Sequence, residues 1–207
     1  MAERAEWTED IVVNVAGAEF ASRLYIEHAA LRAYMRRIAQ DAAGDSACEV
    51  GSGYGRLVPV LKEFFRHVVG FEREPALLKK ARLLFPAVTF REVTSLRALP
   101  AVDDEFCCAL TFTVLQHLSD RDAECAIHEI KRVVSERGAI LLCEDTEAGY
   151  VHDDPKVQGA TFTIGRDVNR YKAWLEPWDL VQIAAREVER GEPRSKVGDY
   201  MLFQRPH

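Results

Sequence analysis

Three glycines at alternate positions follow a short apolar run near residue 50. Residues 47–50 lead into Gly51, Gly53 and Gly55, and from Leu57 the apolar positions recur with a helical period of about 3.6 residues. This pattern predicts a strand, a tight turn and a helix. Glycines let the backbone turn sharply and approach a ligand closely, and the free N–H groups at a helix start favour electron-rich ligand atoms. The stretch is therefore typical of a nucleotide-type cofactor site.

Two charged residues near this turn indicate what the ligand carries. Glu72 follows Gly51 by 21 residues, at the end of a second apolar run, where a carboxylate can accept both hydroxyls of a ribose. Arg56 stands where a dinucleotide-binding G-x-G-x-x-G turn needs its third glycine. A long cation fits poorly against a pyrophosphate, but it suits a ligand with a free carboxylate. An NAD-dependent oxidoreductase is disfavoured for that reason.

The stretch Glu49-Val50-Gly51-Ser52-Gly53-Tyr54-Gly55 resembles the acidic-x-G-x-G-x-G first motif of class I S-adenosylmethionine (SAM) methyltransferases. The resemblance runs from about Cys48 to Leu142 and more loosely to the C-terminus. It implies SAM as the cofactor and S-adenosylhomocysteine (SAH) as the product. Arg56 is expected to bind the methionyl carboxylate and Glu72 the ribose. The full set of implied cofactor-binding residues is Glu49, Gly51, Ser52, Gly53, Arg56, Glu72, Thr94, Ser95, Leu96, Thr111 and Phe112.

The chain departs from the family pattern at two positions. An acidic residue usually follows the third strand and meets the adenine amino group, but this chain has Thr94 there. We therefore expect adenine recognition to rest on Ser95 or on backbone groups, with Leu96 packing on the ring. The acidic residue that usually stands at the start of the fourth strand is also absent, because Cys107 takes its place.

Strand-like and helix-like segments alternate along the chain. Strands separated by helices predict right-handed βαβ units and a parallel sheet. The last two strands are expected to be joined through Gly191 and Pro193 without a helix, which makes the last strand antiparallel. The expected elements are a helix over about residues 18–39, strands over 46–50, 67–72, 88–92, 106–110, 139–143, 180–185 and 200–204, and helices over 56–65, from Pro75, from Ser119 and over 167–176.

These elements predict one α/β domain of Rossmann-like architecture. We expect a mostly parallel seven-stranded sheet with an antiparallel last strand, helices on both faces and an extra N-terminal helix. Residues 1–45 are assigned to an N-terminal segment with a cap helix, and residues 46–207 to the SAM-binding core. A length of 207 residues is compatible with a single domain.

The candidates for catalysis follow the predicted strands, because ligands of open parallel sheets bind beyond their carboxyl ends. His117 follows the fourth strand and can titrate near neutral pH. It is expected either to act on the substrate or to position the loop by bonding to backbone. Glu144 and Asp167 are the other candidate bases, since an amine or phenol acceptor must lose a proton.

The segment 145–166 has no clear periodicity, and a loop of this length is usually functional or disordered. It is expected to contact the substrate, together with the N-terminal helix and the helix that follows the segment. The candidate substrate-binding residues are Tyr25, His28, Tyr150, Phe162, Arg166 and Tyr171.

Composition narrows the choice of partner and compartment. The net charge of −6 argues against a nucleic-acid partner. No apolar run reaches the roughly 18 residues of a membrane span, and the N-terminus has no apolar signal core. The five cysteines form no C-x-x-C pair, so we expect no metal and buried thiols in a reducing cytosol. A cytoplasmic monomer or homodimer is the expectation.

The leading hypothesis is methyl transfer from SAM to a nitrogen or oxygen atom of a small-molecule acceptor. A second hypothesis is methylation of a peptide or protein amine, because His117-Leu118, Glu144-Asp145 and Arg166-Asp167 loosely resemble protein N-terminal amine methyltransferases. A third is a different use of SAM, such as its intramolecular cyclisation, and a fourth is SAM binding without turnover. A closed aromatic pocket at residues 145–166 would indicate a small molecule, and an open groove a peptide.

Overall fold

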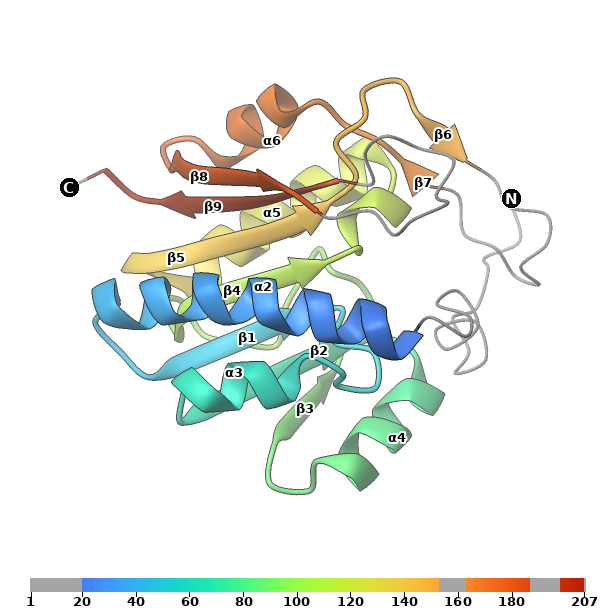
Figure 1. The fold of residues 1–207 in the computed structure, drawn as a ribbon, viewed down its shortest axis with the longest axis vertical. Helices are drawn as coiled ribbons and strands as arrows, with labels where there is room; N and C mark the ends of the chain where they lie inside the picture. The colour runs from blue at the N-terminus through green and yellow to red at the C-terminus, as the bar shows by residue number, and fades with distance from the viewer. Residues whose placement is uncertain (1–19, 153–162, 187–197, 207) are drawn as a thin grey trace.

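Seven strands pair into one sheet with the order β3-β2-β1-β4-β5-β9-β8 (Figure 1). The computed structural model describes residues 20–152, 163–186 and 198–206. Strand β9 runs antiparallel to both of its neighbours, and the other neighbouring pairs are parallel. The strands are β1 Ser46–Val50, β2 His67–Glu72, β3 Thr89–Glu92, β4 Phe106–Phe112, β5 Val134–Glu144, β8 Asp179–Ala185 and β9 Asp199–Gln204.

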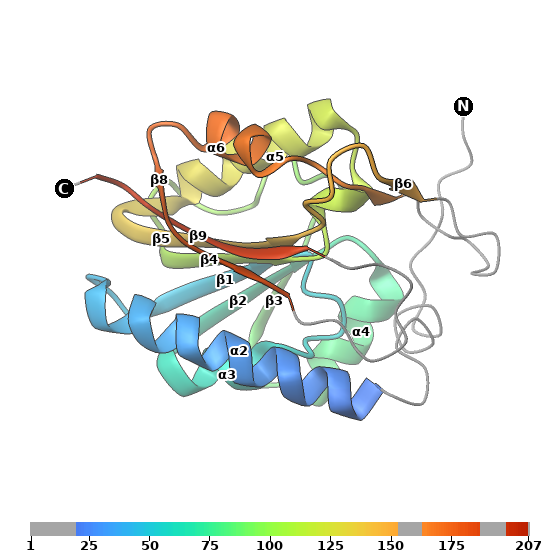
Figure 2. The ribbon, with the colours of Figure 1, turned by 45° about the horizontal axis from the view of Figure 1, so that its top comes forward.

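Helices cover both faces of this sheet. Figure 2 shows α2 and α3 on one side of the strands and α5 and α6 on the other. Helix α4 packs against α3 and β3 through Leu78 and Ala81. No helix in the described ranges is both long enough and apolar enough to cross a membrane. The helices are α2 Phe20–Asp41, α3 Val58–Phe64, α4 Pro75–Leu84, α5 Asp120–Val133 and α6 Val168–Leu175.

The central strands are buried on both faces, which explains their continuous apolar runs. All seven residues of β4 are buried. In β1, Cys48 packs with the α5 and α6 side, whereas Ala47 packs with the α2 and α3 side. The predicted fold is confirmed: a mostly parallel seven-stranded sheet, an antiparallel last strand and an N-terminal helix packed on one face.

The structure differs from the sequence expectation in two places. Strand β5 begins at Val134, directly after α5, where Val134 pairs with Phe106 before a bulge. Within the segment predicted as an irregular loop, β6 (Val151–His152) pairs antiparallel with β7 (Thr163–Ile164). A ladder of two residues per strand is too short to leave a periodic signal. Residues 153–162, which include Phe162, and the predicted turn through Gly191 and Pro193 lie outside the described residues.

Two glycines with positive φ provide a test of the packing at the end of β5. Gly198 has φ of 132°, and a Cβ there would overlap the carbonyl oxygen of Glu144. Gly149 has φ of 80°, but a Cβ there would meet no described atom within 4 Å. Gly149→Ala should therefore cost backbone strain of about 1 kcal/mol, while Gly198→Ala should add an overpacking cost of about 1–3 kcal/mol. Urea denaturation of both variants measures the difference, and equal unfolding midpoints would contradict this packing.

Candidate active site

The glycine turn after β1 has a backbone shape that few other residues adopt. Gly51, Gly53 and Gly55 have φ values of 77°, 55° and 84°, in the left-handed region that favours glycine. A Cβ added at Gly51 would lie 2.5 Å from a methyl group of Val114, whereas one added at Gly53 would meet no described atom within 4 Å. Gly51 is therefore needed for packing against the loop after β4, and Gly53 faces open space that a ligand can enter.

Glu72, the last residue of β2, is anchored beside this turn by backbone N–H groups. Its Oε2 accepts a hydrogen bond from the N–H of Gly53 at 2.6 Å. Its Oε1 accepts from the N–H groups of Arg73 and Glu74 at 2.7 and 2.9 Å. A carboxylate has about four acceptor positions, so these three bonds leave it capacity for a ligand hydroxyl. The carboxylate is held next to the open side of Gly53.

Two buried polar atoms under the turn lack hydrogen-bond partners among the described residues: Glu49 Oε2 and Ser52 Oγ. Both side chains are 2% exposed. Burial raises the pKa of Glu49 to about 8, although the nearby Arg56 opposes the rise. Buried polar groups normally have a partner in the protein or in bound water. These atoms, the anchored Glu72 and the open side of Gly53 together fit a polar ligand with hydroxyl and charged groups.

Arg56 follows the turn, and its guanidinium lies between α2 and the end of β4. Its Nη1 donates to Oε2 of Glu27, and its guanidinium carbon lies 4.7 Å from the centre of the Phe112 ring. The backbone carbonyl of Arg56 accepts from His28 Nε2 at 2.9 Å. Burial lowers the pKa of His28, which favours the neutral ring in this contact. The structure thus brings the predicted residues Arg56, Phe112 and His28 together.

Glu27 is a part of this site that the sequence analysis missed. It is 5% exposed although it carries a carboxylate, and charged side chains are rarely this buried unless they are paired. A glutamate on an amphipathic helix normally belongs to the solvated face. The position of Glu27 in the sequence therefore did not indicate that it is buried in the site. Only the position of α2 across the sheet reveals that this glutamate reaches Arg56.

Glu144 holds the loop after β4, which contains the short 3-10 helix η2 (Leu115–His117). Its carboxylate accepts from Thr111 Oγ1 at 2.7 Å and from the N–H groups of Val114 and Gln116, each at 3.1 Å. The side chain is completely buried. Burial raises the pKa of Glu144, and these hydrogen bonds oppose the rise. Glu144 and Thr111 thus make contacts within the protein that shape the loop.

Arg166 supports the same loop from the opposite side. Its Nε donates to Asp120 Oδ1 at 2.9 Å, and its Nη1 and Nη2 donate to the carbonyls of Leu115 and Leu118 at 2.7 and 2.5 Å. Arg166 is only 4% exposed. The guanidinium therefore satisfies carbonyls around η2, which is a different environment from the substrate contact that the sequence suggested.

His117 is half-buried at the end of η2 and has a polar side chain near each ring nitrogen. Its Nδ1 lies 3.5 Å from Thr163 Oγ1, and its Nε2 lies 3.4 Å from Gln116 Nε2. Gln116 Oε1 accepts from the N–H of Asp145 at 2.9 Å, so the amide of Gln116 presents its NH₂ group to the histidine. This orientation favours Nε2 as the accepting nitrogen and the tautomer with its proton on Nδ1.

The remaining catalytic and substrate candidates differ widely in exposure. Asp167 is exposed and caps α6 by accepting from the N–H of Asn169 at 2.7 Å. Tyr171 is fully buried, with its ring centre 5.9 Å from that of Trp174, and burial raises its pKa. Tyr25 is 75% exposed, and Tyr150 is half-buried next to β6. A fully buried Tyr171 has no surface for substrate contact in this structure.

The predicted adenine-binding residues follow β3. Thr94 is exposed, and Ser95 is half-buried. Ser95 Oγ accepts from the N–H of Arg97 at 3.2 Å. Leu96 is half-buried and packs against the core on the α5 and α6 side. These side chains border the carboxyl edge of the sheet on the same side of β1 as Glu72.

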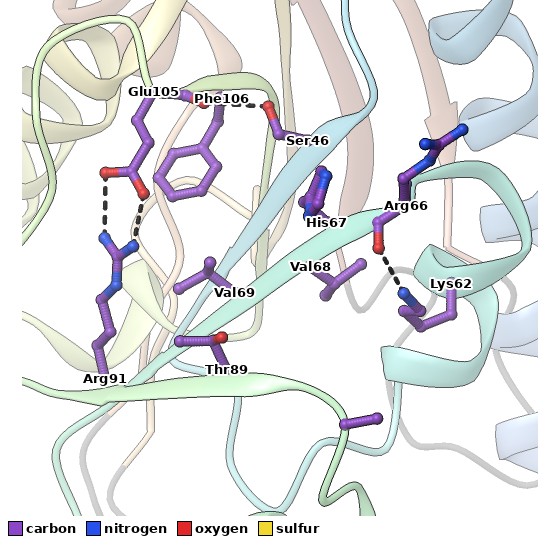
Figure 3. A pocket seen from close by; sticks show the side chains of 11 residues that line it. Ser46, Lys62, Arg66, His67, Val68, Val69, Thr89, Arg91, Glu105 and Phe106 are labelled. Atoms are coloured by element: carbon purple, nitrogen blue, oxygen red, sulfur yellow. Dashed lines mark hydrogen bonds and ion pairs between the residues drawn. The ribbon is translucent and has the colours of Figure 1, made fainter.

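A cavity of about 360 Å³ lies at the opposite edge of the sheet (Figure 3). It is open to solvent and is lined by the first residues of the parallel strands, including Ser46, His67 and Thr89. An ion pair between Arg91 and Glu105 closes one side of it. Open parallel sheets bind their ligands at the carboxyl ends of the strands, so this cavity is separate from the glycine-turn site.

Comparisons with known proteins agree with this geometry. A family model described as a methyltransferase domain matches residues 47–138. A curated relative from Mycolicibacterium smegmatis, named as a probable S-adenosylmethionine-dependent methyltransferase, is 28% identical over 160 residues, which is 74% of this chain and 56% of the relative. The chain thus spans little more than half the length of that relative.

Solved structures share the fold at low sequence identity. A protein from Pyrococcus horikoshii superposes with a TM-score of 0.70 at 14% identity, over 93% of this chain and 94% of that one. A SAM-dependent methyltransferase from Leishmania major gives 0.71 at 17% identity, over 91% and 75%. One from Methanosarcina mazei gives 0.67 at 14% identity, over 78% and 92%. The sheet order, the glycine-rich first motif and these matches lead to one conclusion: residues 47–138 resemble a methyltransferase domain, and the chain is similar to SAM-dependent methyltransferases, whose fold it shares.

Proposed function

We propose that this protein transfers the methyl group of SAM to a nitrogen or oxygen atom of a small-molecule acceptor. One observation carries the proposal: the glycine turn holds the Glu72 carboxylate beside space that no described atom fills, and Glu49 and Ser52 each carry a buried polar atom without a partner among the described residues. The family-model match includes this turn. A net charge of −6 supports a partner other than nucleic acid, and four buried free cysteines support a cytoplasmic location.

The cofactor supplies an activated methyl group, and the protein supplies orientation and exclusion of water. In this proposal, Glu72 accepts a ribose hydroxyl at its remaining acceptor position, and Arg56 binds the methionyl carboxylate by a charge-assisted contact. Gly53 gives the ligand access to the backbone. Ser95 and Leu96 border the adenine ring. Helix α2 covers the site on the side of Arg56, which supports its assignment as a cap helix.

His117 is the proposed base for the acceptor. It lies in the loop after β4, at the carboxyl edge of the sheet, and a neutral imidazole can accept a proton. Glu144 and Arg166 are positioning residues in this account, because their contacts fix η2 from both sides. Asp167 caps α6 at an exposed position and is the second candidate base.

Calorimetry with SAM tests the cofactor site. The protein should bind SAM with micromolar affinity, about −8 kcal/mol. Gly53→Val should abolish binding, because a branched side chain would enter the ligand space and strain the turn. Gly149→Val is the matched control, since Gly149 also has a positive φ and open surroundings, and it should bind SAM normally. Binding of NAD without binding of SAM would contradict the proposal.

Kinetics of His117 variants test the base, once mass spectrometry has identified an acceptor that is methylated. His117→Ala should lower kcat by about 10²- to 10⁴-fold, the usual range for a positioned acid–base group. SAM affinity should stay nearly constant, because the proton moves on the acceptor. His117→Gln should also lose the pH dependence near neutrality. Normal turnover by both variants would mean that His117 only positions the loop, and Asp167→Asn would become the deciding variant.

A further inference from the structure

We propose that Glu27 on α2 is a cofactor-binding residue, which accepts hydrogen bonds from the α-ammonium group of SAM while Arg56 binds the neighbouring carboxylate. The inference rests on the proposed SAM site and adds a residue to it from outside the core motifs. The amino-acid end of SAM carries a positive and a negative group on one carbon. A receptor for both groups needs an anion and a cation side by side, and Glu27 and Arg56 form such a pair.

The burial of this pair distinguishes it from a surface ion pair. The side chains of Arg56 and Glu27 are 19% and 7% exposed. Removing two charges from water has a large free-energy cost, so a buried pair is weak evidence for a stabilising role. A second ion pair, Arg32–Glu63, joins α2 to α3, but its side chains are 39% and 41% exposed. The two helices are therefore linked without the buried pair, whose position calls for another explanation.

The location of the pair supplies that explanation. Arg56 directly follows the glycine turn, and Phe112, on which its guanidinium stacks at 4.7 Å, is the last residue of β4. Both positions belong to the carboxyl edge of the sheet, which the first turns of α2 reach in Figure 1. His28, next to Glu27, bonds to the backbone carbonyl of Arg56 at 2.9 Å. Two adjacent residues of α2 thus hold the side chain and the backbone of Arg56 beside the cofactor site.

The chemistry of the guanidinium allows both partners to bind at once. Arginine has five N–H donors in a rigid plane, and the described contact with Glu27 uses Nη1. The guanidinium carbon lies over the face of the Phe112 ring, 4.7 Å from its centre. A ligand carboxylate can then occupy another edge of Arg56 while the ligand ammonium group lies against the Glu27 carboxylate. The ligand ammonium group then lies next to the negative Glu27, and the ligand carboxylate lies next to the positive Arg56. Each charged group of the ligand therefore has a protein group of opposite sign beside it.

The competing interpretation is that Glu27 only occupies Arg56 until the ligand carboxylate displaces it. The two interpretations predict opposite effects of removing the charge of Glu27. If Glu27 binds the ammonium group, Glu27→Gln weakens the binding of ligands that carry the amino-acid end. If Glu27 only competes, the same change frees Arg56 and strengthens their binding.

Calorimetry with two ligands separates these cases. SAH carries the amino-acid end, and methylthioadenosine has the same thioether nucleoside without it. Glu27→Gln should weaken SAH binding at least tenfold and leave the affinity for methylthioadenosine within twofold of the wild-type value. Glu63→Gln is the matched control, because it removes the exposed pair between α2 and α3, and it should bind both ligands as the wild type does.

Three outcomes would overturn the inference. Unchanged or tighter SAH binding by Glu27→Gln would show that Glu27 does not contact the ammonium group. An equal loss of affinity for both ligands, with a lower melting temperature, would show that Glu27 acts on the fold. A wild-type protein that binds neither ligand would contradict the proposed SAM site itself, and the inference would fall with it.

Discussion

The hydrogen bond from the Gly53 N–H to the Glu72 carboxylate is the interaction on which the candidate site depends. It links the turn after β1 to the end of β2, and it requires the positive φ that Gly53 adopts. Without it, the Gly53 N–H would lose its acceptor and Glu72 would lose its contact with the turn, although Gly51 and Ser52 would still donate to the carbonyl of Phe71. A fixed acceptor at that point costs no reorganisation when a ligand hydroxyl arrives, which is how a preorganised site gains affinity.

The loop after β4 is built on the same principle. Glu144 ends β5 as Glu72 ends β2, and each carboxylate accepts backbone N–H groups from the loop that follows the neighbouring strand. In the loop after β4, Arg166 also donates hydrogen bonds to the carbonyls of Leu115 and Leu118. Buried carboxylates are costly unless their oxygens are hydrogen-bonded, so these contacts fix the loops in one conformation. The carboxyl edge of the sheet is thus rigid where it carries His117.

The sequence predicted the fold more fully than the site. Buried parallel strands leave continuous apolar runs and α5 has a serine cap, so the mostly parallel sheet and the cap at Ser119 could be predicted. Polar residues after the strands were harder to interpret, because their type does not show whether they face a ligand or a protein group. Arg166 binds carbonyls, and Glu144 binds N–H groups. Glu27 gave no signal, because its contact with Arg56 depends on how α2 crosses the sheet.

The central claim is that the turn and Glu72 form a preorganised receptor for the ribose of SAM. Calorimetry with SAH and its 2′-deoxy and 3′-deoxy analogues, on the wild type and on Glu72→Gln, tests it directly. In the wild type, loss of the hydroxyl that Glu72 accepts should cost about 1.5–3 kcal/mol, the range for hydrogen bonds to a charged group. In Glu72→Gln the penalty should largely disappear, because the charged acceptor is gone. Equal penalties in both proteins would contradict the account, since the ribose would then bind elsewhere.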